Sequence, residues 1–370
     1  MSQNPASGSV VVVVKIGTSS ITSASGELDE AAVVKLCAEV AAARADGHEV
    51  VIVCSGAIAA GLPALGLTER PDDIGTLQAI AAVGQPRLME LIGRILRDHG
   101  LVAGQVLLTP HDFGHRSQYL HARETLRRLL DLAVVPVVNE NDTVADDEIR
   151  FGDNDRLAAL VSHLVSADVL VLLTDTSGMF TADPRLDTEA SLIDEIVEVD
   201  AALEELAGGT GTLRGSGGMA SKLAAAKIAA WSGVRVVIAA ADAEGVVLDA
   251  VAGRPVGTVV RARPTRLPSR KLWIAFALGA SGRIVVDGGA REALVRDGRS
   301  LLPAGIRAVE GTFDADAAVE VVTEDGTAFA KGLVRYSAAA LREVAGNRTA
   351  DLPEGAPHEV IHRDDLVVLP

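Results

Sequence analysis

The sequence predicts an α/β protein whose main domain has an open, largely parallel sheet sandwiched by helices, followed by a small β-barrel-like domain. A length of 370 residues exceeds what one hydrophobic core usually serves, which indicates two domains. Apolar residues make up 48% of the chain but aromatic residues only 3%, so the interior is built mainly from Val, Ala, Leu and Ile. Such an interior is typical of parallel strands that helices cover on both faces.

Strands and helices alternate in the first 260 residues. Continuous β-branched runs at 10–14 and 48–53 predict two buried strands, and apolar residues at helical spacing over 28–46 predict the helix that joins them. Strands joined through helices in this way lie parallel, with right-handed crossovers. The alternation continues with predicted helices at 73–99, 118–131, 155–165 and 219–231 and predicted strands at 102–107, 133–138, 169–173 and 234–239.

The pattern changes after residue 260. Residues 261–281 are basic and interrupted by proline, which predicts a linker. We therefore divide the chain into an α/β domain at 1–260, the linker at 261–281 and a β-rich domain at 282–370. In the last domain, short apolar runs between glycine turns predict strands at 283–286, 305–310, 319–323, 328–336 and 366–369.

The formal net charge of −16 limits the classes of partner. Nonspecific binding to nucleic acid or to anionic lipid needs a cationic surface, so neither is expected, and a bound nucleotide would need a locally positive site. Cys37 and Cys54 lack the spacing of a zinc site and are expected to be buried thiols in a reducing compartment. No segment has the length of a membrane helix or the pattern of a signal peptide, so we expect a cytoplasmic protein.

Two glycine loops carry lysines that could hold phosphate. Lys15 and Gly17 follow the first strand, at the sheet edge where open α/β folds bind ligands, and Gly17 would let backbone N–H groups approach phosphate oxygens. The loop 215–218 leads into a helix that carries Lys222 one turn inside. Taken alone, each loop could equally be a strand end or a plain turn, and neither is a P-loop or a dinucleotide fingerprint. Together the lysines suggest phosphoryl transfer, which needs positive charge on the transferring and departing oxygens.

Polar residues follow other predicted strands at the same edge of the sheet. Ser55 and Gly56 come after the second strand and could present backbone donors to a substrate carboxylate, although Ser55 also suits a plain helix N-cap. Thr174 and Asp175 follow a later strand, where a nucleotide base or ribose could lie, and a strand-end turn explains them as well.

The segment 139–155 is densely acidic and lies between two apolar runs. One of its aspartates could be a helix N-cap, but several acids near two lysines would also orient those lysines. Residues 146–148 are expected to form a solvated loop. His111, His115 and His121 have no accompanying cysteine, so surface histidines are expected there rather than a metal site.

Several of these motifs, in this order, resemble those of bacterial glutamate 5-kinases. In that family an amino-acid kinase domain is joined to a C-terminal PUA domain, which implies the amino-acid kinase fold for the first domain. The resemblance covers nearly the whole chain, including PUA-like segments at 287–290, 298–306 and 362–366, and departs from the family at His121, where Asn is usual, and Ser216, where Thr is common. The motifs are Lys15-Ile-Gly-Thr-Ser, Ser55-Gly-Ala-Ile-Ala-Ala-Gly, Asn139-Glu-Asn-Asp-Thr-Val, Phe151-Gly-Asp-Asn-Asp, Thr174-Asp and Gly217-Gly-Met-Ala-Ser-Lys222.

The resemblance assigns roles to individual residues. It implies that Lys15 and Lys222 flank the transferring phosphoryl group and that Asp155 positions both lysines. Substrate binding is assigned to Ser55, Gly56, Asp142, Asn154 and Asp153. ATP binding is assigned to Lys15, Gly17, Thr174, Asp175, Ser216, Gly217, Gly218, Met219, Ala220, Ser221 and Lys222.

The implied reaction is the ATP-dependent phosphorylation of the side-chain carboxylate of L-glutamate to L-glutamate 5-phosphate, the first step of proline biosynthesis. A carboxylate with a pKa of about 4.3 is already a nucleophile at neutral pH, so no general base is needed. The remaining task is to bring two anions into line, with Mg²⁺ held mainly by the nucleotide phosphates and no metal ligand expected from the protein. Asp142 would pair with the free α-amino group of glutamate, a cation that an N-acetylated substrate lacks.

Two other functions remain open at this point. A related kinase of N-acetylglutamate, aspartate or carbamate would share the fold and the lysines. RNA binding is the other, since PUA-like domains elsewhere contact RNA. The charge of 281–370 opposes it, with 10 Lys and Arg against 15 Asp and Glu, and only the basic segment 261–271 favours it.

The resemblance also implies three properties of the assembled enzyme. They are a homo-oligomer, feedback inhibition by proline, and handover of the product to the reductase that forms glutamate 5-semialdehyde. Handover would be useful because an acyl phosphate beside a free amine cyclises.

Overall fold

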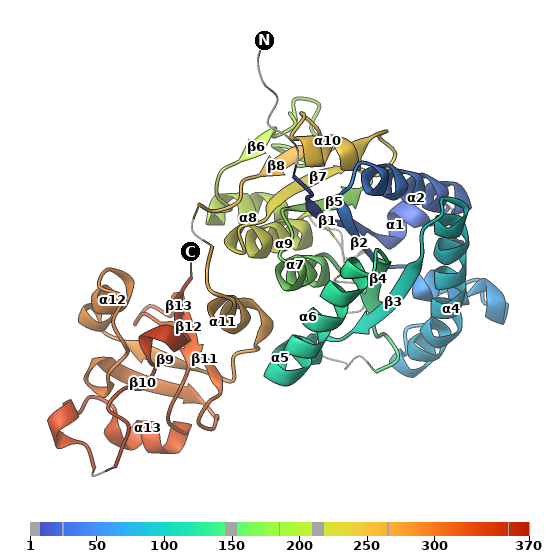
Figure 1. The fold of residues 1–370 in the computed structure, drawn as a ribbon. Helices are drawn as coiled ribbons and strands as arrows, with labels where there is room; N and C mark the ends of the chain where they lie inside the picture. The colour runs from blue at the N-terminus through green and yellow to red at the C-terminus, as the bar shows by residue number, and fades with distance from the viewer. Residues whose placement is uncertain are drawn as a thin grey trace. The chain divides into compact units, whose positions relative to one another are not determined.

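The computed structural model divides into two compact units, residues 1–266 and 267–370, whose ribbons are shown in Figure 1. The structure describes residues 8–23, 26–144, 154–184, 186–208, 218–264, 266–353 and 355–369. A large sheet flanked by helices forms the first unit and a smaller sheet with short helices forms the second, which confirms the predicted fold class. In the described part of the chain, no helix combines the length and the apolar character that crossing a membrane requires.

The first unit is built on an eight-stranded sheet with the strand order β3-β4-β2-β1-β5-β7-β8-β6. Every neighbouring pair is parallel except β7 with β8, as the alternation of strands and helices predicts. Val, Leu and Ile dominate the central strands because helices bury them on both faces. The strands are β1 (Val11–Ile16), β2 (Glu49–Cys54), β3 (Ala103–Leu108), β4 (Val135–Glu140), β5 (Val169–Thr174), β6 (Glu195–Ile196), β7 (Arg235–Ala240) and β8 (Thr258–Val260).

Helices cover both faces of this sheet (Figure 1). Val12, Val14 and Ile16 of β1 share one core cluster with residues of α2, α4 and α10. Side chains alternate along a strand, so Val13 and Lys15 lie on the opposite face, where α7 packs. The helices are α2 (Glu30–Ala45), α4 (Ile74–Asp98), α6 (Arg116–Asp131), α7 (Asn154–Val165), α9 (Met219–Trp231) and α10 (Val246–Ala252).

The short helix α3 (Ala57–Gly61) packs on α4 by direct backbone contact. A methyl group added at Gly84 would lie 1.8 Å from the carbonyl oxygen of Ala57, and one added at Gly61 would lie 2.2 Å from that of Ile80. Only glycine permits such an approach. The contact holds the middle of α4 beside the turn that follows β2.

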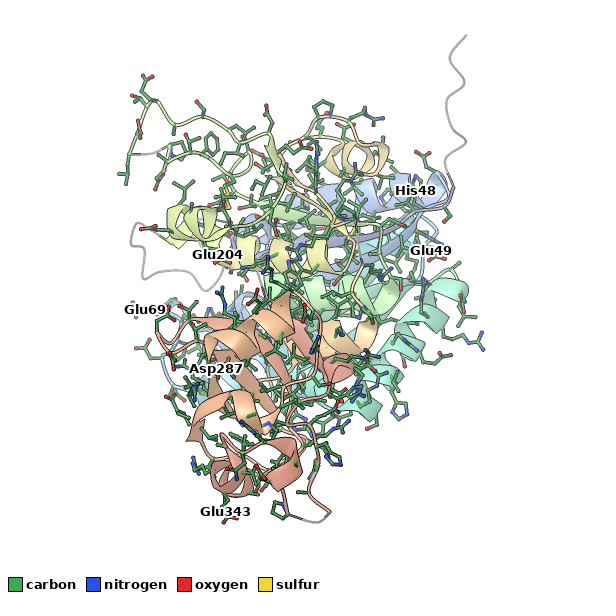
Figure 2. All side chains as sticks on the ribbon, turned by 90° about the vertical axis from the view of Figure 1, so that its left-hand side faces the viewer. His48, Glu49, Glu69, Glu204, Asp287 and Glu343 are labelled. Atoms are coloured by element: carbon green, nitrogen blue, oxygen red, sulfur yellow. The ribbon has the colours of Figure 1, made fainter. Side chains whose placement is uncertain are left out.

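Several further short helices were not predicted. A helix of four to eight residues completes at most about two turns, too few for a recurrent apolar spacing. Local hydrogen bonds fix its ends instead: Asp287, labelled in Figure 2, accepts one from the backbone N–H of Ala290 at 2.8 Å at the start of α12. These helices are α1 (Thr18–Ile21), α5 (Pro110–Gly114), α8 (Ala201–Gly208), α12 (Gly288–Val295) and α13 (Ala338–Val344), with 3-10 turns at Pro63–Leu65, Pro303–Gly305, Thr349–Asp351 and Arg363–Asp365.

The second unit contains a five-stranded sheet in the order β10-β9-β11-β12-β13. Its neighbouring strands are antiparallel except β9 with β11. Apolar residues from every strand form one core with α12 and α13. The strands are β9 (Gly282–Val286), β10 (Ile306–Gly311), β11 (Ala318–Val322), β12 (Ala328–Leu333) and β13 (Leu366–Val368).

Part of the predicted linker is helical and belongs to the second unit. Helix α11 (Ser269–Leu272) runs directly into a π-helix at Trp273–Ala277. Lys331 of β12 donates hydrogen bonds to the carbonyl oxygens of Ala275 and Leu278, which attach this segment to the smaller sheet. The structure divides the chain at 266, and the domain boundaries at 260 and 281 stay predictions.

Candidate active site

Lys15 lies in the middle of the large sheet, near the carboxyl end of β1. Strands β2 and β5 flank β1, and Lys15 is opposite Val53 on one side and Leu172 on the other. Ser55 follows β2 and Thr174 ends β5, so the residues predicted for substrate and for nucleotide lie on opposite sides of Lys15. Open α/β sheets bind ligands at such a point, where connections leave a central strand in two directions.

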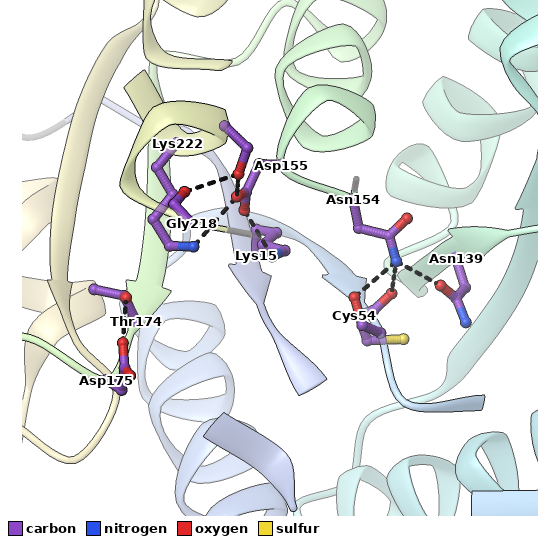
Figure 3. A network of polar contacts seen from close by, with 11 residues as sticks. Lys15, Cys54, Asn139, Asn154, Asp155, Thr174, Asp175, Gly218 and Lys222 are labelled. Carbon is purple, nitrogen blue, oxygen red and sulfur yellow. Dashed lines mark hydrogen bonds and ion pairs between the residues drawn. The ribbon is translucent and has the colours of Figure 1, made fainter. Parts of the chain in front are cut away.

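Asp155, the second residue of α7, joins the two predicted lysines (Figure 3). Its Oδ1 lies 2.6 Å from Nζ of Lys15, and its Oδ2 lies 3.3 Å from Nζ of Lys222. Ser221 donates a hydrogen bond from Oγ to Oδ2 at 2.7 Å. The two lysines and the aspartate are at most 5% exposed. Each carboxylate oxygen thus holds one ammonium group, which fixes two cations from distant parts of the chain around one anion.

The surroundings of Asp155 favour its ionised form. Burial by itself would raise the pKa of the carboxyl group, but the charges of Lys15 and Lys222 and the hydrogen bonds from Lys15 and Ser221 outweigh burial, so the pKa is lowered. The Asp155 carboxylate is therefore charged beside two ammonium groups, in a chain whose formal charge is −16. The two ammonium groups are the cations that the sequence predicts for a phosphate site, and this role stays a prediction.

Asn154 comes directly before Asp155 but belongs to a separate, neutral network (Figure 3). Its Nδ2 lies 2.8 Å from each of three acceptors, namely the carbonyl oxygen of Cys54, Oγ of Ser55 and Oδ1 of Asn139. A carbonyl oxygen can only accept, so these partners fix which end of the Asn154 amide is the NH₂ group. Its Oδ1 is buried and has no hydrogen-bond partner among the residues that the structure describes. Such an atom is an acceptor available to a ligand.

The turn after β2 depends on Gly56. This residue has φ of +105°, and a methyl group added to it would lie 2.8 Å from Cδ1 of Ile21. Both features require glycine. Gly56, and not Ser55, occupies the N-cap position of α3, which has no side-chain cap. The Ser55 hydroxyl bonds Asn154 instead, so the plain N-cap explanation of Ser55 is wrong.

Asp142 lies two residues beyond β4. Burial raises the pKa of its carboxyl group to about 6, and the charge of Arg70 acts in the opposite direction. Burial also raises the pKa of the Cys54 thiol to about 12, and the nearby charge of Asp142 adds to that rise. Asp142 follows the strand that carries Asn139, a hydrogen-bond partner of Asn154, and Cys54 is the buried thiol that the sequence predicts.

The residues predicted to bind nucleotide lie on the other side of Lys15. Thr174 donates a hydrogen bond from Oγ1 to Oδ1 of Asp175 at 3.0 Å, and in Figure 3 this pair is on the Lys222 side of the site. A methyl group added at Gly17 would lie 3.4 Å from Nζ of Lys15, so the backbone passes directly beside that ammonium group.

The first turn of α9 completes this side. Gly218 is its N-cap residue, and no side chain of the described residues caps the helix. Backbone N–H groups at the start of a helix commonly bind phosphate, which is the role predicted for this turn. Met219, Ala220, Ser221 and Lys222 follow in the helix, with Lys222 facing Asp155.

Three predicted residues, Asp153, Ser216 and Gly217, lie outside the described residues, and their roles stay predictions. Within the described residues, no group of three or more His, Cys, Asp or Glu side chains could hold a metal ion. Asp155 already accepts contacts from two lysines and a serine. The described side chains therefore do not fit a metal that is held by the protein alone.

Gln85 was not among the residues predicted for the site, but its Oε1 accepts a hydrogen bond from Nδ2 of Asn139 at 2.7 Å. Gln85 is the polar member of an otherwise apolar face of α4. A polar residue within an apolar stripe is the signal that could have found it. The other buried residues of α4 are Leu77, Ile80, Ala81, Gly84, Leu88, Ile92, Ile95 and Leu96.

Comparisons with known proteins agree with this fold. The model of the amino acid kinase family matches residues 10–240, and that of the PUA domain matches residues 282–355. A glutamate 5-kinase from Pelobacter propionicus is 44% identical, and one from Geobacter sp. (strain M21) is 46% identical, each over 97% of this chain and 97% of that protein. Among solved structures, the carbamate kinase from Giardia lamblia bound to AMP-PNP is similar over 69% of this chain and 99% of its own. Its TM-score of 0.51 at 16% sequence identity bears on the fold alone.

Proposed function

Because the chain belongs to the amino acid kinase family and, within it, to the glutamate 5-kinases, we propose that it transfers the γ-phosphoryl group of ATP to the side-chain carboxylate of L-glutamate. The product would be L-glutamate 5-phosphate, and the step would be the first of proline biosynthesis. One structural observation carries the proposal beyond family membership. Lys15 and Lys222, which are far apart in the sequence, share the buried Asp155 at the carboxyl edge of the sheet.

Transfer of a phosphoryl group between two anions needs fixed cations more than it needs proton transfer. The acceptor carboxylate, with a pKa of about 4.3, is ionised at neutral pH and attacks without a base. Lys15 and Lys222 would lie against the oxygens of the transferring and departing groups, where negative charge moves during the reaction. Asp155 fixes both ammonium groups beforehand, so little reorganisation is needed. Mg²⁺ bound by the nucleotide phosphates would neutralise part of their charge.

The Asn154 side of the site supports an amino acid with a free α-amino group as the acceptor. Oδ1 of Asn154 is a buried acceptor with no hydrogen-bond partner among the described residues, and Asp142 is a carboxylate that follows β4, the strand whose Asn139 bonds Asn154. An amide oxygen and a carboxylate together suit an ammonium group. An N-acetyl group would leave the carboxylate unpaired, which costs about 1–3 kcal/mol or more. These contacts favour glutamate over N-acetylglutamate.

ATP-dependent formation of glutamyl hydroxamate by wild type, Lys15→Ala and Lys222→Ala tests the two-lysine mechanism. We expect kcat to fall at least about 100-fold in each variant, because each removes a charge from the phosphoryl group in the transition state. Lys227→Ala is the matched control on α9. Lys227 pairs with Glu204, labelled in Figure 2, at 2.6 Å, and its loss should leave activity intact.

The same assay, with ADP release measured in parallel, separates the possible acceptors. Glutamate should react faster than N-acetylglutamate, aspartate or carbamate. Full activity in both Lys15→Ala and Lys222→Ala would contradict the mechanism, and a preference for N-acetylglutamate would contradict the substrate and the role of Asp142.

RNA binding as the main function has less support. Arg261 and Arg263 of the basic segment form ion pairs with Glu195 and Glu198, and the Arg263 guanidinium lies 4.0 Å from the ring centroid of Trp231. The positive charges of Arg261 and Arg263 are thus paired with carboxylates of the first unit. Salt-sensitive RNA binding at micromolar protein without kinase activity would reverse the ranking.

Family membership alone supports the remaining properties that we propose. They are a cytoplasmic homo-oligomer, feedback inhibition by proline and handover of the acyl phosphate to a reductase. Unchanged kinetics with added proline would remove the second of these.

A further inference from the structure

We propose that Gln85 is a positioning residue that fixes the orientation of Asn154 and thereby sets the affinity for the amino-acid substrate. The inference rests on the proposed function, because Asn154 is taken to contact that substrate. Gln85 is on α4 and Asn154 is on α7, and Asn139 of β4 connects them.

The three side-chain amides form a hydrogen-bonded chain with one direction. Nδ2 of Asn154 donates to Oδ1 of Asn139 at 2.8 Å, and Nδ2 of Asn139 donates to Oε1 of Gln85 at 2.7 Å. Oδ1 of Asn139 also accepts from the backbone N–H of Glu140 at 2.9 Å. A side-chain amide has an NH₂ group on one side and an oxygen on the other. Each hydrogen bond in the chain therefore determines which way the next amide group is turned. The chain ends at Oδ1 of Asn154, the buried acceptor for which the described part of the protein supplies no partner.

The fold holds Gln85 in place. Its side chain is buried on the face of α4 that is otherwise apolar, where a polar group is costly unless it is hydrogen-bonded. The adjacent Gly84 keeps α4 in backbone contact with Ala57 of α3. The backbone at Gln85 is therefore held in place by the contact between the two helices.

Removing the acceptor at residue 85 would release the whole chain. Methionine is close to glutamine in size but accepts hydrogen bonds only weakly, so Nδ2 of Asn139 would be left unpaired in the interior. If Asn139 turned to satisfy that group, its oxygen would leave Asn154. Oδ1 of Asn154 would then no longer be held toward the ligand. The network of Asp155 and the two lysines is separate, and it would remain intact.

Steady-state kinetics of Gln85→Met and Gln85→Glu test this role. For Gln85→Met we expect the KM for glutamate to rise about tenfold, while kcat and the KM for ATP change less than about twofold. Gln85→Glu keeps an acceptor oxygen and should recover most of the affinity. Gln78→Met makes the same replacement two turns earlier on α4 and should keep the wild-type KM.

A residue that only stabilises the fold would give a different result. Lower melting temperatures with an unchanged KM for glutamate, or equal rises in KM for glutamate and for ATP, would overturn the proposal. In Gln85→Asn the side chain is one methylene shorter, so the amide oxygen no longer reaches Asn139 although the side chain stays polar. This variant provides the same test if Gln85→Met does not fold.

If the wild-type protein had no activity, the proposed function would be refuted. The link between Gln85 and Asn154 would then be tested by measuring stability. Unfolding of Gln85→Met, Asn154→Ala and the double variant then forms a double-mutant cycle. We expect clear coupling between the two positions, and additive changes would overturn the inference.

Discussion

Asn154 and Asp155 are neighbours in the sequence, but they belong to two networks with different chemistry (Figure 3). The Asp155 carboxylate meets two ammonium groups and a hydroxyl, whereas the Asn154 amide meets a carbonyl, a hydroxyl and another amide. The difference matches two tasks. Transferring a phosphoryl group needs charged side chains that are already in position. Recognising an amino acid needs hydrogen-bond donors and acceptors whose orientation is fixed. The first turn of α7 anchors both.

The two networks should also respond differently to damage. A buried group of charges cannot lose one member without leaving another charge unpaired in the interior. A neutral chain of amides loses less when one member is removed, because the remaining groups carry no net charge. We therefore expect variants of the charged network to show the largest effects.

Asp155→Asn would break the charged network at its centre. We expect kcat to fall about 1000-fold, because Lys15 and Lys222 lose their shared anchor, and the free energy of unfolding to fall by about 3 kcal/mol. Hydroxamate formation and urea unfolding measure the two losses. The double variant Asp155→Asn/Lys222→Met restores the balance of charge and should regain stability without activity. Recovery of activity in it would show that Asp155 does not act through the lysines.

Asp142→Asn would show whether substrate binding on the Asn154 side depends on this carboxylate. Burial raises the pKa of the Asp142 carboxyl group to about 6, so below that pH the group is protonated and cannot pair with an ammonium group. In the wild type, kcat/KM for glutamate should be constant above about pH 6 and fall as the pH is lowered through it. In Asp142→Asn we expect KM to rise about 30-fold at pH 7.5 and the decline near pH 6 to disappear.

The control for this prediction is kcat at saturating glutamate, which should change little in the variant. If the decline near pH 6 persists in Asp142→Asn, another group is responsible for it. The substrate amino group would then need a different partner.

His163→Leu tests a buried histidine of α7 that belongs to neither of the two networks at the start of this helix. Burial, and then the charges of Arg266 and Arg123, lower the pKa of His163 to about 4, and neither of its buried ring nitrogens has a hydrogen-bond partner among the described residues. A histidine in the unfolded chain has a pKa of about 6.5. Between these values the unfolded state binds a proton that the folded state does not, so stability falls as the pH is lowered. The loss should be about 1 kcal/mol at pH 5.5.

Urea unfolding at pH 7.5 and pH 5.5 measures this effect. His163→Leu should remove the loss, and His121→Leu, at an exposed position on α6, should keep the wild-type behaviour. The comparison with wild type is needed because the raised pKa of Asp142 acts in the opposite direction over the same range. An identical pH dependence in His163→Leu and wild type would contradict the assignment.

The sequence predicted the fold because the fold depends on local patterns, and the same patterns pointed to Lys15, Lys222 and Asp155, which the structure brings together while their roles stay predictions. Lys15 follows a run of valines and precedes Gly17, which indicates a strand end at the ligand-binding edge without any knowledge of the partner. The link from Gln85 to Asn139 joins residues 54 positions apart, and it exists only because α4 packs beside β4. The Ser55 hydroxyl illustrates the same limit, since a local rule predicts an N-cap and a residue 99 positions away takes the bond instead.

The alternation of side chains along β1 makes the length of this strand a functional constraint. One residue inserted or deleted before Lys15 would move its ammonium group to the face occupied by Val12 and Val14, among aliphatic side chains and away from Asp155. Exchanging one β-branched residue for another at those valines costs about 1 kcal/mol. A change of register would remove Lys15 from the proposed phosphate site and bury an unpaired charge at once, so β1 should tolerate substitutions much better than insertions.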